Sequence, residues 1–168
     1  MKAELKLPND GIKSLNPLFL LIICLGLMAC APTVMLPGDQ VVMPTLDEDT
    51  FTTSDNSALP IKSWLPKDGT INHIIIALHG FNDYSNFFHD SALWLQQFAV
   101  ASFSYDQRGF GASANTGLWA GANTMAQDLT EFIGVIKKRY PNTPIYLLGE
   151  SMGGAVVMVT MTEKNSPD

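Results

Sequence analysis

The sequence of 168 residues is long enough for one folded domain. Hydrophobic residues make up 46% of it and charged residues 15%, a composition that is typical of a globular chain and excludes an intrinsically disordered one. The net charge of −6 argues against a nucleic-acid partner, because proteins that bind nucleic acids carry basic surfaces.

The first 29 residues have the pattern of an export signal. Three lysines precede an apolar run over residues 18–29, which is shorter than the roughly 20 residues of a membrane span and fits the core of a secretory signal. The segment Leu27-Met-Ala-Cys30 resembles the lipobox of bacterial lipoproteins, in which the cysteine is lipidated and becomes the new N-terminus. We therefore predict a lipoprotein signal peptide over residues 1–29. An uncleaved N-terminal anchor is the alternative.

Lipid on Cys30 predicts attachment to a membrane, because two or more acyl chains anchor a protein stably. Ala31 stands where an aspartate often retains lipoproteins at the inner membrane, so we expect a bacterial cell-envelope protein at the outer membrane, facing the periplasm. Residues 30–50, which contain three prolines and an acidic cluster, are interpreted as the lipidated cysteine and an extended tether. The folded domain is predicted over residues 51–168.

The first elements expected in that domain are two short strands, at residues 51–53 and 59–65, with Pro60 favouring an edge position. Residues 73–78 form a continuous apolar, largely β-branched run, as in a strand buried on both faces. A helix is predicted over residues 86–97. Its expected apolar face consists of Phe87, Phe88, Leu93, Trp94 and Phe98.

The second half of the domain continues this alternation. A strand at residues 100–105 is followed by the loop 106–113 and by the clearest helical pattern of the chain, at 123–140. The apolar residues that repeat at helical spacing there are Met125, Leu129, Phe132, Ile133 and Ile136. A last strand, 145–148, leads into a helix that starts at residue 152. Strands alternating with helices predict an α/β domain with a mostly parallel sheet flanked by helices.

The junction between the last strand and the last helix carries the most informative motif, Gly149-Glu-Ser-Met-Gly153. This G-x-S-x-G pattern stands in the strand–turn–helix context of a nucleophile elbow, in which a sharp turn exposes the serine and requires small residues on both sides of it. We therefore predict that Ser151 is a catalytic nucleophile, supported by Gly149 and Gly153. A tight glycine turn that carries an inert serine is the alternative.

A second motif, His79-Gly-Phe-Asn82, directly follows the first buried strand. In the elbow architecture this loop supplies one backbone N–H of an oxyanion hole, and the residue after the nucleophile supplies the other. Phe81 and Met152 are therefore the predicted donors. We expect His79 and Gly80 to shape the loop, and His79 is not expected to be the catalytic base.

Together with Asp128 and the segments 105–113 and 148–154, the histidine–glycine motif resembles the monoacylglycerol lipase and lysophospholipase group of α/β-hydrolases, also called the serine aminopeptidase S33-like or Hydrolase-4 family. The resemblance covers residues 59–163. It implies the N-terminal half of an α/β-hydrolase fold, without the later strands and the lid. It also implies hydrolysis of lipid or other carboxylic esters, such as monoacylglycerols or lysophospholipids, with Ser151 as the nucleophile. No metal-binding cluster is visible, so we expect neither a metal nor a cofactor.

The sequence departs from this family after the elbow. The family's acid and histidine follow the serine along the chain, whereas only Glu163 and Asp168 are acidic residues beyond Ser151, and all three histidines precede it. We therefore expect residues 51–168 to be a truncated α/β-hydrolase domain that lacks the triad acid and histidine and is inactive alone. A non-catalytic surface lipoprotein that keeps a hydrolase-like shape is the alternative function.

Two local patterns in the loop after residue 105 have their own interpretations. We interpret Asp106 and Arg108 as a structural pair, because a charged hydrogen bond orders a short loop. Gly109-Phe-Gly-Ala-Ser-Ala114 matches the G-x-G-x-x-A fingerprint of dinucleotide-binding proteins, which is a third hypothesis. That fingerprint must open a helix, however, and here Asn115-Thr-Gly117 follows, which argues against it.

Overall fold

The computed structural model describes residues 16–17 and 34–162, and the chain divides into an N-terminal unit, 1–32, and a domain unit, 33–168. Cys30 and the predicted signal segment, apart from residues 16–17, lie outside the described residues. The signal-peptide and lipidation predictions therefore stay predictions. No helix formed by the described residues is long and apolar enough to cross a membrane.

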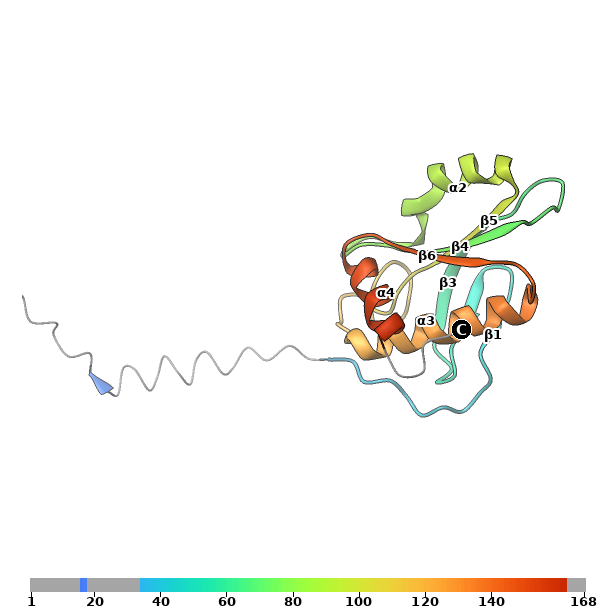
Figure 1. The fold of residues 1–168 in the computed structure, drawn as a ribbon. Helices are drawn as coiled ribbons and strands as arrows, with labels where there is room; N and C mark the ends of the chain where they lie inside the picture. The colour runs from blue at the N-terminus through green and yellow to red at the C-terminus, as the bar shows by residue number, and fades with distance from the viewer. Residues whose placement is uncertain (1–15, 18–33, 163–168) are drawn as a thin grey trace, which may run out of the picture. The chain divides into compact units, whose positions relative to one another are not determined.

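A six-stranded sheet forms the centre of the domain, with the strand order β1-β2-β3-β5-β4-β6 (Figure 1). The strands are β1 (Thr45–Leu46), β2 (Thr50–Thr52), β3 (Ala58–Trp64), β4 (His73–Leu78), β5 (Val100–Tyr105) and β6 (Ile145–Gly149). The pairings from β1 to β5 are antiparallel, and only those of β4 with β5 and with β6 are parallel. The α/β class is as predicted, but the sheet is mixed where the sequence predicts a mostly parallel one. The difference arises at the N-terminal strands, because β1, β2 and β3 are joined by short turns without intervening helices and β3 also pairs antiparallel with β5.

The parallel part of the sheet positions the segments that follow β4 and β6. The register of β4 with β6 runs from Ile74 opposite Ile145 to Leu78 opposite Gly149. Because parallel strands end at the same edge of a sheet, the residues that follow β4 and β6 leave the sheet side by side. Every residue of β5 is buried, which is the environment of a central strand covered on both faces.

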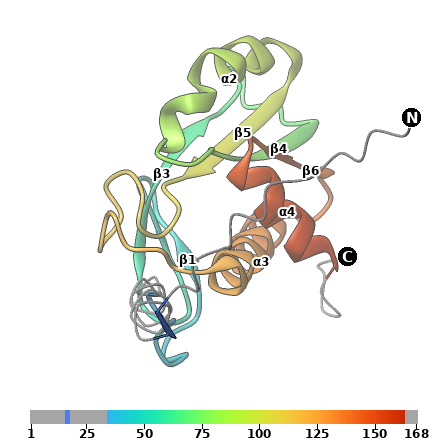
Figure 2. The same ribbon diagram turned by 90° about the vertical axis from the view of Figure 1, so that its left-hand side faces the viewer.

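Helices cover the two faces of this sheet (Figures 1 and 2). One face carries the short helices η1 (Ser85–Phe88), α2 (His89–Leu95) and η2 (Gln96–Phe98), and the other carries α3 (Ala122–Arg139) and α4 (Met152–Thr162). All five apolar residues predicted for the face of α3 are buried, so that prediction is confirmed. Phe132 of α3 packs edge-on against Phe51 of β2, with ring centroids 4.9 Å apart, and joins the N-terminal hairpin to the main core.

The apolar face predicted for the helix at 86–97 is largely wrong. Phe88 and Ala92 are buried against β3 and β4, whereas Trp94 is 59% exposed. Leu93 and Phe98 are also exposed. Phe88 and Ala92 are four residues apart and occupy one helical face, but 3-10 turns at both ends of α2 change the period, so a simple helical count selects the wrong stripe.

The edge position predicted for Pro60 is also wrong, because β3 lies between β2 and β5. The β5 ladder ends where Tyr105 pairs with Ile61, and the Pro60 carbonyl beyond it accepts a hydrogen bond of 2.8 Å from the Asp106 N–H. In a strand, the nitrogen and the carbonyl of one residue point to the same side. The nitrogen of Pro60 therefore points toward Asp106, which lies beyond the end of β5. The missing N–H of Pro60 thus removes no hydrogen bond between β3 and β5.

The described part of the predicted tether lies along the domain. The Met35 N–H donates to the Trp119 carbonyl at 2.7 Å, and the Val41 N–H donates to the Ser54 carbonyl at 2.8 Å. β1 and the first residue of β2 also fall within residues 30–50. A strand as short as β1 carries no readable periodicity, which is why the sequence pattern did not predict it.

Candidate active site

Ser151 occupies a sharp turn between β6 and α4. It is exposed and has a φ of +48°, in the left-handed region that residues other than glycine rarely adopt. The turn is held by the Glu150 N–H, which donates to the Leu78 carbonyl at 3.0 Å, and by the Gly153 N–H, which donates to the Glu150 carbonyl at 2.8 Å. This is the strand–turn–helix geometry that the sequence motif predicts, with an exposed serine in the turn.

The two flanking glycines are required by close approaches of the backbone. A β-carbon on Gly149 would collide with the backbone of Gly153 and Gly154, and a β-carbon on Gly153 would collide with the Leu78 carbonyl. Backbone atoms cannot move aside as the end of a flexible side chain can. Gly149 and Gly153 therefore let the turn close tightly enough to present Ser151.

The loop after β4 lies directly against this turn. A β-carbon on Gly80 would lie 3.7 Å from Ser151 Cβ and 3.7 Å from the Glu150 carbonyl oxygen. Phe81, the next residue, is 63% exposed, and Met152 is half-buried at the start of α4. The structure thus brings together the predicted nucleophile, the supporting glycines and the two segments that contain the predicted oxyanion donors.

His79 is fully buried at the base of this loop, and both its ring nitrogens contact backbone groups. Nε2 lies 3.0 Å from the Gln107 N–H, and Nδ1 lies 2.8 Å from the Gly80 carbonyl oxygen. Burial lowers the pKa of His79 below its usual value, against the opposing effects of the Gly80 carbonyl and of nearby carboxylates. The neutral ring is therefore favoured in the folded protein.

Sequence reasoning did not identify Gln107, whose side chain is the second contact of this loop. Gln107 Nε2 donates to the His79 carbonyl at 2.8 Å, and the residue is only 1% exposed. The two residues lie 28 positions apart in the sequence. A buried amide in the segment after β5 was the only signal, and nothing local indicates its partner.

The other histidines lie away from Ser151. His73 begins β4, at the opposite end of that strand from the elbow, and its ring lies 5.8 Å from that of Tyr146. His89 Nδ1 accepts a hydrogen bond of 3.1 Å from the Trp64 indole N–H. Within residues 34–162, no side chain is hydrogen-bonded to Ser151 Oγ. Glu163 and Asp168 lie outside the described residues.

A cavity of about 390 Å³ opens beside the loop after β4. Residues 81–84 form one wall, and residues 109–111 and 116–119 form the other. Its apolar and aromatic side chains are those of Phe81, Tyr84, Phe110, Leu118 and Trp119. The cavity therefore offers an apolar surface next to one predicted oxyanion donor.

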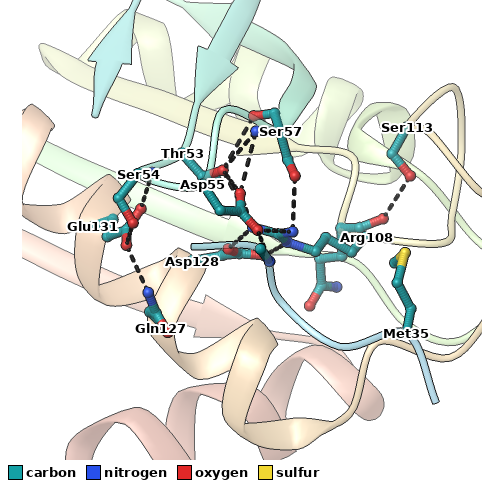
Figure 3. A network of polar contacts seen from close by, with 12 residues as sticks. Met35, Thr53, Ser54, Asp55, Ser57, Arg108, Ser113, Gln127, Asp128 and Glu131 are labelled. Atoms are coloured by element: carbon teal, nitrogen blue, oxygen red, sulfur yellow. Dashed lines mark hydrogen bonds and ion pairs between the residues drawn. The ribbon is translucent and has the colours of Figure 1, made fainter. Parts of the chain in front are cut away.

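The sequence predicts that Arg108 pairs with Asp106, and this prediction is wrong. Arg108 pairs with Asp55 and Asp128 instead (Figure 3). Its guanidinium donates to the Asp55 carboxylate at 2.7 and 2.8 Å and to the Asp128 carboxylate at the same two distances. Asp106 instead accepts backbone hydrogen bonds of 2.8 Å from Ser85 and from Ala112. Asp106 and Arg108 thus have different partners. Asp106 binds the backbone of Ser85 and Ala112, whereas Arg108 binds the side chains of Asp55 and Asp128.

The Arg108 cluster ties the β2–β3 turn to α3 and to the loop after β5. The pKa values of the two partner carboxyls are shifted in opposite directions. Burial acts to raise the pKa of Asp55, but hydrogen bonds from Arg108 and its other donors bring it well below its usual range. Burial raises the pKa of the more deeply enclosed Asp128 to about 6, despite the lowering effect of Arg108. One guanidinium with two buried carboxylates makes this a structural centre whose members depend on each other.

The described residues do not support the dinucleotide hypothesis. After the glycine-rich segment the chain turns back, with the Gly117 N–H donating to the Gly109 carbonyl at 2.8 Å, and α3 does not begin until Ala122. The glycines there fit a closed loop rather than a phosphate-binding helix start. The described residues also contain no cluster of three or more histidine, cysteine, aspartate or glutamate side chains placed to hold a metal ion.

Comparisons with known proteins identify a family and several lipases that this chain resembles. Residues 69–168 match the family described as serine aminopeptidase, S33. The chain is 28% identical to human monoglyceride lipase over 123 residues, which cover 73% of this chain and 40% of that protein. It is 27% identical to the monoacylglycerol lipase of Mycolicibacterium smegmatis over 127 residues, which cover 70% of this chain and 42% of that protein. The chain thus spans about two fifths of the length of these relatives.

Solved structures show the same fold. A lipase in its open form matches with a TM-score of 0.62 at 20% identity, over 71% of this chain and 41% of that one. A thermostable carboxyl esterase from Bacillus coagulans matches with a TM-score of 0.60 at 22% identity, over 70% of this chain and 40% of that one. Parallel central strands with helices on both faces and a glycine-flanked serine at the end of one strand define an α/β-hydrolase fold. Because the family match covers more than half of its length, the chain belongs to the serine aminopeptidase S33 family.

Proposed function

We propose that this protein is a serine hydrolase of carboxylic esters that acts on monoacylglycerols or lysophospholipids. One observation carries the proposal: Ser151 is exposed in a left-handed turn at the end of β6, and a β-carbon on Gly80 would lie 3.7 Å from Ser151 Cβ. A strained, exposed serine beside a loop that can donate backbone N–H groups is the arrangement that acyl transfer requires.

In the proposed reaction, Ser151 Oγ attacks the ester carbonyl carbon and an electron pair moves onto the carbonyl oxygen. The backbone N–H groups of Phe81 and Met152 stabilise this oxyanion, and removal of one such donor costs on the order of 100-fold to 1000-fold in rate. The intermediate then expels the alcohol, which takes up the proton that Ser151 Oγ lost, and water hydrolyses the acyl-enzyme, which releases the carboxylic acid and restores the serine hydroxyl. The family order puts the acid and the base after the elbow, so the proposal assigns neither role to residues 34–162.

The proposed substrate class follows from the surroundings of the nucleophile. The cavity beside Phe81 is lined largely by aromatic and aliphatic side chains and is suited to the apolar part of an ester. Two relatives carry names that specify monoacylglycerol or monoglyceride hydrolysis. A lipid anchor on Cys30 at the outer membrane, which we propose from the lipobox, would bring the protein close to such amphiphiles.

The test is covalent labelling of the full-length protein by an alkyl fluorophosphonate, with the modified peptide identified by mass spectrometry. In a full-length protein that supplies the acid and the base after the elbow, we expect an adduct on Ser151 and none in Ser151→Ala, together with hydrolysis of a monoacylglycerol by the wild type only. Ser91→Ala, which changes an exposed serine on α2, is the matched control and should be labelled as the wild type is. Equal labelling of the Ser151→Ala protein would contradict the proposal.

A non-catalytic surface lipoprotein is the second candidate. It is supported by the apolar cavity beside Phe81, which needs no catalytic base to hold an apolar ligand. In that case the apolar cavity beside Phe81 would bind a lipid without turnover. A full-length protein that retains a fluorescent monoacylglycerol analogue, yet neither hydrolyses it nor reacts with the fluorophosphonate, would favour this candidate over the esterase.

A further inference from the structure

The orientation of one predicted oxyanion donor is linked to a side chain. The Gly80–Phe81 peptide is trans, as are all described peptide bonds, so its carbonyl and its N–H point in opposite directions within one rigid plane. The Gly80 carbonyl oxygen lies 2.8 Å from His79 Nδ1. Whatever holds this carbonyl therefore also sets the direction of the Phe81 N–H.

The backbone partners of His79 determine which ring nitrogen carries the proton. The Gln107 N–H can only donate, so Nε2, at 3.0 Å, must accept from it with its lone pair. A neutral imidazole then carries its proton on Nδ1, where the Gly80 carbonyl is available only as an acceptor. One tautomer satisfies both contacts, and the other satisfies neither.

The ring cannot readily turn away from this position. His79 is fully buried, and Gln107 Nε2 donates to its carbonyl at 2.8 Å, so the same residue holds the histidine by main chain and by side chain. The Phe110 ring packs edge-on against the rings of both His79 and Phe81, with centroids 5.7 and 5.3 Å apart. The loop is thereby braced from the segment that follows β5.

We propose that His79 is a positioning residue that locks the Gly80–Phe81 peptide, and with it the Phe81 N–H beside Ser151, and that Gln107 selects the Nδ1–H tautomer needed for the lock. The oxyanion donor is then preformed before substrate binds. A flipped peptide would remove the donor and would leave the buried Nδ1–H of His79 facing an N–H group. This inference rests on the proposed function for its effect on rate, but its geometry can be tested without turnover.

The first test is imidazole nitrogen NMR of the full-length wild type at pH 8. We expect His79 to have a protonated Nδ1 and an unprotonated Nε2, whereas a histidine without fixed partners populates both tautomers. The charged groups that face His79 are Asp83, Asp106 and Glu150. A protonated Nε2 in the neutral ring would overturn the proposal whether or not the protein is an esterase.

The second test compares two substitutions that each keep one half of the imidazole. His79→Asn retains a donor near the Nδ1 position and His79→Gln retains an acceptor near the Nε2 position. If the lock on the Gly80 carbonyl matters, His79→Gln lowers kcat for a short-chain ester by about 100-fold with KM little changed, and His79→Asn retains at least tenfold more activity. His89→Gln, on α2, should match the wild type.

The outcomes of the second test are distinguishable from failure of the proposed function. Wild-type kcat in His79→Gln, or a greater loss in His79→Asn than in His79→Gln, would overturn the lock. Full activity in Ser151→Ala would instead overturn the esterase proposal, and the NMR result would still decide the tautomer. If both His79 variants fail to fold, judged by thermal melting, the wild-type NMR measurement remains decisive.

Discussion

Ser151 and its flanking glycines show how a few residues define a strained, exposed turn. A positive φ at a serine is costly, on the order of 1 kcal/mol or more, and is maintained only where the surrounding contacts require it. Here the requirement comes from the tight crossing of Gly149 and Gly153 with neighbouring backbone. The contacts of the surrounding fold therefore offset the cost of this backbone conformation. The strained turn places the Ser151 hydroxyl at the end of β6.

Gly153→Ala should destabilise the protein, because the added methyl group meets the Leu78 carbonyl, which cannot move without distorting β4. We expect a loss of about 2–3 kcal/mol in the free energy of unfolding and loss of fluorophosphonate labelling, measured by urea denaturation and mass spectrometry. Gly134→Ala in α3 is the matched control. A β-carbon there meets nothing within 4 Å, so the better helix former should stabilise by up to about 1 kcal/mol. Equal stability of the two variants would contradict the steric argument.

At the scale of elements, the Arg108 cluster joins three parts of the chain that share no local pattern. It connects the β2–β3 turn, the loop after β5 and helix α3 through hydrogen bonds of 2.7–2.8 Å. The loop after β5 also carries Gln107, which contacts His79. A charged cluster some distance from Ser151 thus helps to fix the loop that faces the elbow.

Arg108→Ala should be strongly destabilising, because it leaves Asp55 and Asp128 buried without their shared cation. We expect a loss of about 3–5 kcal/mol in the free energy of unfolding, measured by urea denaturation at pH 7. Arg108→Lys should recover only part of it, since an ammonium group cannot bind two carboxylates with paired hydrogen bonds. Lys138→Ala on the exposed end of α3 should change stability by no more than about 0.5 kcal/mol. Near wild-type stability of Arg108→Ala would show that the cluster is dispensable.

At the scale of the whole molecule, the candidate site residues of the described domain lie at one end of the parallel strands, where β4 and β6 both end. Residues 35–42, directly after the N-terminal unit, lie against the domain through backbone hydrogen bonds to Trp119 and Ser54. Trp119 also lines the cavity beside Phe81. Met35 is thus hydrogen-bonded to a residue that lines the proposed substrate cavity.

The lipid anchor proposed for Cys30 can be tested in cells. In a bacterial host, the wild type should incorporate an alkyne-labelled fatty acid and sediment with outer membranes. Cys30→Ser should lose the label and accumulate as a larger, unprocessed form. Cys24→Ser is the control, because Cys24 lies within the predicted signal and should not affect labelling. Persistent labelling of Cys30→Ser would exclude the lipobox interpretation.

The sequence by itself determined the features that depend on neighbours within a few residues. The elbow at Ser151, the glycines beside it, the buried face of α3 and the strands β4, β5 and β6 follow from steric limits and from helical or strand periodicity, which act locally. The helix at 86–97 was the exception, because 3-10 turns interrupt its period.

Only the tertiary structure decided the contacts between distant segments. Arg108 was predicted to pair with nearby Asp106, yet it binds Asp55, 53 positions away, because the hairpin β2–β3 folds beside β5. Gln107 was not recognised, since its partner His79 is brought to it by the parallel pairing of β4 with β5. Such pairs are chosen by which strands lie side by side, and that arrangement is settled by burial of the whole core.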